Sequence, residues 1–531
     1  MSLPAGISRI PITDWQNGHL NFSVELTKDA SFNMRLPFAF NQNEDNYRAT
    51  TKNFQWLIQH AIDNGLTLRA LGNGWSFSEV AVCKGGLVDT RELRTFFKIG
   101  DSFLSPAYLA TGKTANDLVF TQCGMSILQM HKELESENGW LRSMKASGAS
   151  NGQTIVGATA TGTHGSAMGV GAVHDAIRGL HIITGPDKHV WIERASQPVA
   201  SDEFIAWLGA APIRDDAAFN AAVVSFGSFG FIHSVLIETD PIYLLKKFVR
   251  GPLAYTEAVR HAINTWDFTG IEDLFPFPLN SPDKELYHFE VVVNPHKFAK
   301  EDPVNGVFIK TIYKMPHSTG YPPPNTENGR FQYGDELLGV MQSVLDAVGK
   351  PLRQKLIPPI VNQLFPLAYA AAEEVTGTIG EMFNNTKFRG QAASAAMAID
   401  SKDASRAIEE IVAINSKTVF AGAIALRFIK GTPATLGFTH FNKTCVLEMD
   451  GVESKSSRNF FEKVWSRFEA LGIPYTLHWG KINFILNEER VRQMYGESAV
   501  NQWKNWRETL LDEPTRKVFT NDFMVRCGLS G

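Results

Sequence analysis

Residues 147–166 read SGASNGQTIVGATATGTHGS, and this stretch decides how the rest of the chain is interpreted. Small residues or hydroxyls occupy nearly every position, so it shows neither the helical nor the strand period of apolar side chains. Such a backbone can lie against a flat polar ligand and hydrogen-bond it directly. The alternative is a glycine-rich structural turn. The residues predicted to contact a ligand are Gly148, Thr154, Gly157, Thr161, Thr163, His164 and Gly165.

Two shorter glycine clusters flank this stretch in the sequence. Residues 69–78, RALGNGWSFS, follow a predicted strand, and residues 225–232, SFGSFGFI, precede another at 234–238. Glycines there allow backbone amides to converge on an anion, although each cluster alone is also typical of a tight turn. The first is neither a GxxxxGK[ST] loop nor a dinucleotide fingerprint, because no helix with the expected acidic residue follows. The predicted contacts are Gly72, Asn73, Gly74, Trp75, Ser76, Gly227, Gly230 and Ile232.

The bulk composition excludes several classes of protein. The chain has 531 residues, 44% of them hydrophobic, and a formal net charge of -4, which gives no basic surface for nucleic acid. Its four cysteines form no CxxC pair, so no metal site is predicted. The start of the sequence lacks the pattern of a secretory signal, which favours the cytoplasm. Prolines interrupt the apolar stretch 356–372, which predicts irregular helices and no transmembrane segment.

Periodicity predicts a mixture of helices and strands. Apolar spacing predicts a helix over 52–65 followed by a strand, and a second helix that begins at Ser126 with a capping box to Gln129. Strands are predicted at 287–293 and 418–429, with a long proline-rich loop at 317–330. Because the character changes near Pro241 and again near Pro474, we expect an α+β fold. Its expected parts are a first domain at 1–245, an inserted domain at 246–470 and a segment at 471–531 that completes the first.

The order of the three clusters resembles the flavin domain of the vanillyl-alcohol-oxidase family, also called the para-cresol-methylhydroxylase type. The 69–78 loop is similar to its pyrophosphate loop, and 153–166 to the stretch that wraps the isoalloxazine. Residues 477–481, LHWGK, resemble a box of aldonolactone and alditol oxidases, and 512–521 resemble their closing DPxxxFxN, which adds Asn521 to the predicted site. The resemblance implies a two-part FAD-binding domain, interrupted by an α+β substrate domain, in an enzyme that oxidises CH–OH groups.

One departure from the family concerns the attachment of the flavin. Many members carry a histidine in the first loop that is bonded covalently to the flavin, and some add a cysteine. Here Trp75 stands at the histidine position or one beside it, no histidine lies in the loop, and no cysteine lies near Gln153. The resemblance therefore implies FAD that is bound without a covalent link.

The substrate side of the flavin departs from the family as well. Alditol oxidases and class II cholesterol oxidases carry a Glu-x-Arg on a strand that faces the flavin. Here Arg427 is kept, Ala425 replaces the acid, and Glu448 on the next strand is the predicted carboxylate and proton acceptor. The alternative for each charged residue is a paired structural charge.

The 477–481 box supplies two further predicted residues. Lys481 is expected beside the flavin, where a cation stabilises the reduced form, although a solvated lysine is the alternative. His478 is either a core histidine or a flavin contact.

The expected reaction is hydride transfer from a small or hydrophobic alcohol to the flavin. In related flavoproteins a small residue just before the flavin-wrapping stretch controls the access of O2 to the flavin, and the alignment puts Gly148, or Ala149 if it slips by one, at that position. The resemblance therefore implies reoxidation by O2, because a residue without Cβ leaves a path open. Two alternatives remain: an aldonolactone or sugar dehydrogenase with another electron acceptor, and a flavin-binding protein that has lost catalysis. The sequence predicts neither the substrate itself nor the oligomeric state.

Overall fold

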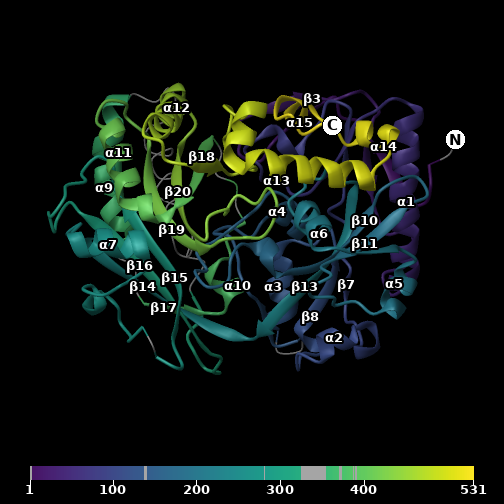
Figure 1. Ribbon diagram of the computed structural model, residues 1–531, viewed down its shortest axis with the longest axis horizontal. Helices are drawn as coiled ribbons and strands as arrows, with labels where there is room; N and C mark the ends of the chain where they lie inside the picture. The colour runs from purple at the N-terminus through teal and green to yellow at the C-terminus, as the bar shows by residue number, and fades with distance from the viewer. Residues whose placement is uncertain are drawn as a thin grey trace.

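The computed structural model describes residues 3–136, 140–279, 281–324, 354–369, 374–386, 388 and 391–531. Sheets and helices are mixed along the chain, which confirms the predicted α+β class. In Figure 1 the N-terminal half lies on the right, and a large sheet with its own helices lies on the left.

Two sheets and a hairpin form the N-terminal half. The first sheet contains, in spatial order, β1 (Ile7–Ile10), β4 (Ser31–Met34), β6 (Gly86–Asp89) and β5 (Leu68–Leu71). The second contains β12 (Ala211–Arg214), β11 (His189–Glu193), β10 (Ile177–Ile183), β13 (Phe231–Pro241), β8 (Leu118–Gln122) and β7 (Phe96–Phe97), with β9 (Arg142–Met144) on the end of β13. The hairpin pairs β2 (Asp14–Gln16) with β3 (Ser23–Glu25).

A third sheet of eight strands dominates the other half. Its order is β17 (Val375–Gly377), β14 (Tyr243–Leu253), β16 (Val307–Pro316), β15 (Glu285–Val293), β19 (Gly422–Lys430), β20 (Lys443–Val452), β18 (Ala392–Asp400) and β21 (Tyr475–Leu477). The predicted boundary at 245 falls inside β14. The predicted C-terminal segment contributes β21 to this sheet.

Helices cover both halves of the molecule. The N-terminal half carries α1 (Asn43–Asp63), α2 (Pro106–Leu109), α3 (Ile127–Glu135), α4 (Ile155–Ala160), α5 (Asp202–Leu208) and α6 (Asp216–Ala222). The third sheet carries α7 (Glu257–Thr265), α9 (Ile357–Tyr369), α10 (Ile379–Met382), α11 (Ala404–Asn415) and α12 (Lys455–Ala470). The chain returns to the N-terminal half in α13 (Glu488–Leu510), α14 (Glu513–Val518) and α15 (Asp522–Arg526), drawn in yellow in Figure 1.

The helix predicted at 52–65 begins nine residues earlier, at Asn43. Its first turns bury polar residues, and the Tyr47 hydroxyl lies 2.6 Å from His181 Nδ1. Apolar spacing therefore missed this part of the helix. The predicted start of α3 is confirmed, because Ser126 caps it and forms the capping box with Gln129.

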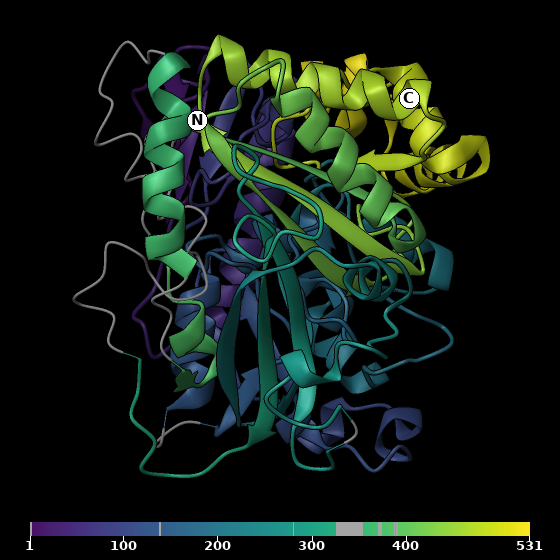
Figure 2. The same cartoon turned by 90° about the vertical axis from the view of Figure 1, so that its left-hand side faces the viewer.

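The prediction of irregular helices in 356–372 is wrong where the structure describes it. Residues 357–369 form one helix, α9, in which Pro358 and Pro359 lie in the first turn, where a missing N–H is tolerated, and Pro366 lies inside the helix. Its apolar side packs on Ala423 and Ala425 of the third sheet. Figure 2 looks onto this half, with α9 at the left edge and α12 across the top. Among the described residues, no helix is long and apolar enough to cross a membrane.

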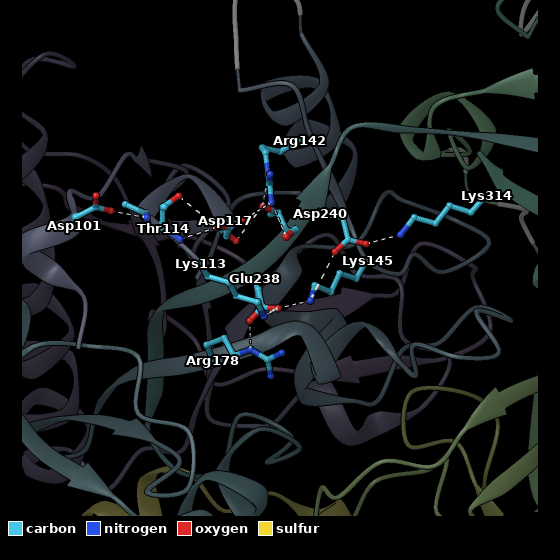
Figure 3. Close-up of polar contacts among 12 residues, drawn as sticks. Asp101, Lys113, Thr114, Asp117, Arg142, Lys145, Arg178, Glu238, Asp240 and Lys314 are labelled. Carbon is cyan, nitrogen blue, oxygen red and sulfur yellow. Dashed lines mark hydrogen bonds and ion pairs between the residues drawn. The ribbon is translucent and has the colours of Figure 1, made fainter. Parts of the chain in front are cut away.

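One residue, Ile242, connects the second sheet to the third, since β13 ends at Pro241 and β14 begins at Tyr243. A cluster of charges surrounds this connection (Figure 3). We call it the junction network; it comprises Glu238, Asp240, Lys113, Lys145, Arg178 and Lys314.

The junction network ties several segments to the end of β13. Glu238 lies 2.7 Å from Lys113 and 2.8 Å from Arg178, and it also binds Lys145. Asp240 pairs with Lys314 of β16 at 2.6 Å. These contacts join the two halves and hold residue 145, from which the 147–166 stretch continues.

Candidate functional site

One cavity brings the three glycine clusters together with the charged residues of the third sheet. It runs from the start of β13, past the 69–78 loop and the 147–166 stretch, to β19 and β20. The predicted residues that line it are Gly72, Asn73, Gly74, Trp75, Ser76, Gly148, Thr154, Gly157, Thr161, Thr163, His164, Gly227, Gly230, Ile232, Arg427, Glu448, His478 and Lys481.

The glycines let the cavity walls pack against one another. A Cβ on Gly72 would lie 2.4 Å from Thr154 Oγ1, and a Cβ on Gly152 would lie 2.2 Å from the Trp75 ring. Gly227 differs, because its φ is +66° and nothing lies within 4 Å of where its Cβ would be. The walls therefore present backbone and small side chains to whatever the cavity holds.

Two predicted contacts do not line the cavity. Gly165 packs instead on Ser147, since its Cβ would lie 2.2 Å from the Ser147 carbonyl oxygen. The Asn521 amide donates to the carbonyl of Val82 at 2.7 Å and accepts from the N–H of Met524. Both residues support the walls, and Asn521 does so by holding the turn that follows the first loop.

The 477–481 box closes the first loop from the other side. The Phe77 N–H donates to the Gly480 carbonyl at 2.8 Å, and the Ser78 hydroxyl donates to the Trp479 carbonyl at 2.5 Å. Residues some 400 positions apart in the sequence thus form one wall of the cavity.

Sequence reasoning missed part of the cavity wall that lies before α1. Trp15 and His19, from the hairpin of β2 and β3, both line the cavity. The His19 ring stacks on Phe77 with centroids 3.9 Å apart and meets Trp75 edge-on at 5.4 Å. Single aromatic residues in a short hairpin carry no periodic signal, so only the fold shows this contact.

A row of charged side chains crosses the third sheet and reaches the cavity. Lys310 lies opposite Glu290, which in turn lies opposite Arg427, on neighbouring strands. The distances are 2.6 Å from Lys310 to Glu290 and 3.5 Å from Glu290 to Arg427. The predicted adjacency of the strands that carry Arg427 and Glu448 is confirmed, because β19 pairs with β20.

Glu448 lies directly opposite Ala425, the position that lacks the expected acid. It binds Lys481 and lies 3.4 Å from both Arg427 and His164 Nε2. Burial alone would raise the pKa of Glu448, but the charges of Lys481 and Arg427 outweigh burial and hold that pKa well below its ordinary range. Glu448 is therefore an ionised partner of two cations.

Asp450 shares the cavity-facing side of β20 with Glu448. It lies opposite Ser394 of β18, whose hydroxyl donates to Asp450 Oδ1. Burial raises the pKa of Asp450, and the nearby charge of Glu448 adds to the effect while Lys481 opposes it. Ser394 is a further residue that sequence reasoning missed, because the register of β18 against β20 is invisible in the sequence.

The two remaining predicted residues hold the turn after β21. His478 Nδ1 accepts the N–H of Gly480 at 2.9 Å, and burial holds the pKa of His478 well below its ordinary value, so the ring is neutral. Lys481 contacts Glu448 and lies 3.8 Å from Asp450 Oδ1. We call Arg427, Glu448, Asp450, Lys481 and Ser394 the cavity network.

Comparison with known families finds a flavin-binding family that part of the chain resembles. A family described as an FAD binding domain matches residues 48–193, which include the first loop and the whole 147–166 stretch. The match supports the expected FAD-binding domain, since it contains two of the three glycine clusters.

Comparison with characterised sequences finds oxidoreductases. D-arabinono-1,4-lactone oxidase of Debaryomyces hansenii is 23% identical over 198 residues, which cover 37% of this chain and 32% of that protein. L-gulono-1,4-lactone dehydrogenase of Mycobacterium tuberculosis is 25% identical over 191 residues, which cover 36% of each protein. The chain thus spans about a third of the length of the curated relatives it matches.

Comparison with solved structures extends the likeness of fold to nearly the whole chain. Cholesterol oxidase from B. sterolicum superposes with a TM-score of 0.67 at 15% identity, covering 98% of this chain and 97% of that one. Chitooligosaccharide oxidase superposes with a TM-score of 0.60 at 10% identity, covering 96% and 94%. The chain thus shares its fold with these two proteins over nearly its whole length.

Proposed function

We propose that this chain is an FAD-dependent oxidoreductase that oxidises a CH–OH group of a substrate alcohol. The proposal rests on which parts of the molecule the cavity connects. It begins in the FAD-binding domain and ends on the cavity network of the third sheet. Charged groups held in a partly dry pocket are what hydride and proton removal from an alcohol requires.

The backbone of the glycine clusters would hold the FAD. The 69–78 loop offers backbone amides, and the wall from Gly148 to His164 offers backbone and small side chains. Bound FAD supplies the acceptor for a hydride that leaves the substrate carbon. Arg427 is placed to stabilise negative charge that develops on the substrate oxygen, and Lys481 supplies a second cation. Glu448 orients both cations, since it contacts each of them.

A sugar lactone or polyol is the second candidate for the substrate. The curated relatives support it, because they are described as aldonolactone oxidases and dehydrogenases. A larger, apolar alcohol is the first candidate. The fold shared with cholesterol oxidase supports it, and so does the apolar face that α9 packs on the sheet beside Ala425.

An anaerobic screen of the FAD-loaded protein tests the proposal. Alcohols, sterols and sugar lactones are added in turn, and loss of the flavin absorbance reports hydride transfer. We expect one class to bleach the flavin, and Arg427→Met to retain FAD but bleach at least about tenfold more slowly. Arg467→Met is the matched control, because Arg467 pairs with Glu410 on the surface. If no compound bleaches the wild-type protein, the chain is a flavin-binding protein without this activity.

We also propose that FAD is held without a covalent bond. The resemblance puts Trp75 at the position of the linking histidine or one beside it, and the Trp75 ring packs against Gly152. Acid precipitation should therefore leave a yellow supernatant. A yellow pellet would contradict this, and His19 is then the first residue to replace, because its ring lies beside Trp75.

Reoxidation by O2 is a further part of the proposal. Gly148 lines the cavity, and a Cβ there would lie 3.0 Å from Thr163 Cγ2, so a larger side chain would crowd Thr163 and narrow the cavity at this point. Stopped-flow mixing of reduced protein with O2 should show fast reoxidation, and Gly148→Val should slow it without slowing reduction. Faster reoxidation by a quinone or dye than by O2 would indicate a dehydrogenase.

A further inference from the structure

We infer that Asp450, rather than Glu448, accepts the proton of the substrate hydroxyl. The inference rests on the proposed function and assigns a catalytic base within it. Both carboxylates line the cavity from the same face of β20, so geometry and charge must decide between them.

Glu448 is saturated with positively charged and imidazole partners. Lys481 binds Oε2, while Arg427 and His164 both approach Oε1 at 3.4 Å. A proton on Glu448 would break these ion pairs in a buried site and leave two cations without a full counter-charge. Glu448 therefore stays ionised through the reaction and is a poor base.

Asp450 is held differently. Ser394 donates to Oδ1, and Lys481 lies 3.8 Å from the same oxygen. Among the residues that the structure describes, no hydrogen bond or ion pair reaches Oδ2. Since Asp450 lines the cavity, Oδ2 is the oxygen that remains for a substrate hydroxyl.

The charged groups that face Asp450 come from three elements. They are Glu448 on its own strand, Arg427 on β19 and Lys481 after β21, and Ser394 on β18 adds its hydroxyl. Burial and the charge of Glu448 raise the pKa of Asp450, although the two cations oppose them. The raised pKa brings the proton affinity of Asp450 closer to that of a useful base near neutral pH.

The oxidant in this step is the bound FAD of the proposed function. The substrate O–H bond breaks, its proton moves to Oδ2 of Asp450, and its electron pair forms the carbonyl π bond. The C–H bond of the same carbon breaks, and its hydrogen leaves with both electrons to the bound FAD. Asp450 later returns the proton to solvent.

Kinetics of flavin reduction separate the two carboxylates. FAD-loaded wild-type, Asp450→Asn and Glu448→Gln proteins are reduced anaerobically by the same alcohol across the pH range. Asp450→Asn should slow reduction by about 100-fold or more and abolish the fall in rate at low pH. Glu448→Gln should also slow reduction but keep the low-pH fall. Asp450→Glu should restore part of the rate.

The opposite pattern would overturn the inference: the low-pH fall persists in Asp450→Asn and disappears in Glu448→Gln. A wild-type protein that no alcohol reduces would instead defeat the proposed function and leave the assignment to a second measurement.

That measurement needs no turnover. Difference infrared spectra of the FAD-loaded protein at low and neutral pH should show the band of a protonated carboxyl that Asp450→Asn removes and Glu448→Gln retains. Removal of the band by Glu448→Gln alone would refute the assignment of Asp450.

Discussion

The junction network and the cavity network are built on the same short pattern. Glu238 and Asp240 end β13, Glu448 and Asp450 lie in β20, and each pair is spaced by one residue so that both acids share a face. Burial opposes the ionisation of Glu238, but Arg178, Lys113 and Lys145 lower its pKa to about 2, and the pKa of Glu448 is depressed in the same way. In both networks the glutamate is a fixed counter-ion.

The two aspartates differ. Asp240 has a lysine of its own, Lys314 at 2.6 Å, and its side chain is 24% exposed. Asp450 is 3.8 Å from a lysine that Glu448 already binds, its side chain is 7% exposed, and it lines a cavity. The comparison indicates which acid is a candidate for chemistry: a buried acid that lacks a cation of its own and lies beside a cavity. The glutamate two residues before it, whose charge is fully paired, is structural.

The largest expected effect is on the junction network. Glu238→Gln would leave three cations around a neutral group, so we expect the free energy of unfolding to fall by about 3 kcal/mol. That is the low end for a broken buried pair, because Lys113 is 42% exposed and stays hydrated. Urea unfolding measures the change, and Glu79→Gln in an exposed pair with Arg526 is the control. If the free energy of unfolding falls by no more than in the Glu79→Gln control, then the two networks differ in strength as well as in chemistry.

The next effect concerns the cations. Lys481→Met should lower the rate of flavin reduction and the affinity for sulfite by roughly tenfold or more, since one charged hydrogen bond of about 1.5–3 kcal/mol is lost. Lys113→Met, its counterpart at the junction, should leave both unchanged. Absorbance titration with sulfite gives the affinities. Equal behaviour of the two variants would show Lys481 to be a structural charge.

A smaller effect is expected on the pH dependence of stability, to which Asp450 contributes. The pKa of Asp450 is raised in the folded protein, so its contribution to stability is present at low pH and is lost as pH rises through the folded pKa. Asp450→Asn should therefore gain thermal stability relative to wild type as pH rises from acid to neutral. Melting curves at several pH values test this direction, and a loss of relative stability with rising pH would show that Asp450 is stabilised as an anion.

The smallest effect is expected at Asp240. Asp240→Asn removes a pair whose lysine is 25% exposed and can be solvated, so the unfolding free energy should change by less than about 1 kcal/mol. Flavin reduction should not change. A loss of more than about 3 kcal/mol in urea unfolding would place Asp240 among the buried structural charges beside Glu238.

The sequence predicted the parts of this molecule that are encoded locally. The glycine clusters, the cap at Ser126 and the acid that faces Ala425 are all visible as patterns of neighbouring residues. Contacts set by the register between distant strands were not visible. Ser394 opposite Asp450 and Lys310 opposite Glu290 depend on how β18 and β16 align with their partners.

Buried polar side chains do not show up in apolar periodicity. For this reason the start of α1 and part of the cavity wall were not predicted. The start of α1 buries tyrosine and threonine hydroxyls, which pair with histidines on the second sheet and break the apolar period. His19 reaches the cavity from a hairpin about 55 residues before Trp75, with no motif to mark it.

The closure of the first loop by the 477–481 box has a consequence for biosynthesis. Ser76 and Gly480 are 404 residues apart. At about 5–20 residues per second, the ribosome needs roughly 20–80 s to make the second after the first. Throughout that interval the nascent chain carries its glycine loops without one wall of the pocket. The complete pocket is therefore a late product of synthesis, and a chain stalled before Gly480 has the glycine loops but lacks the surface that closes the first of them.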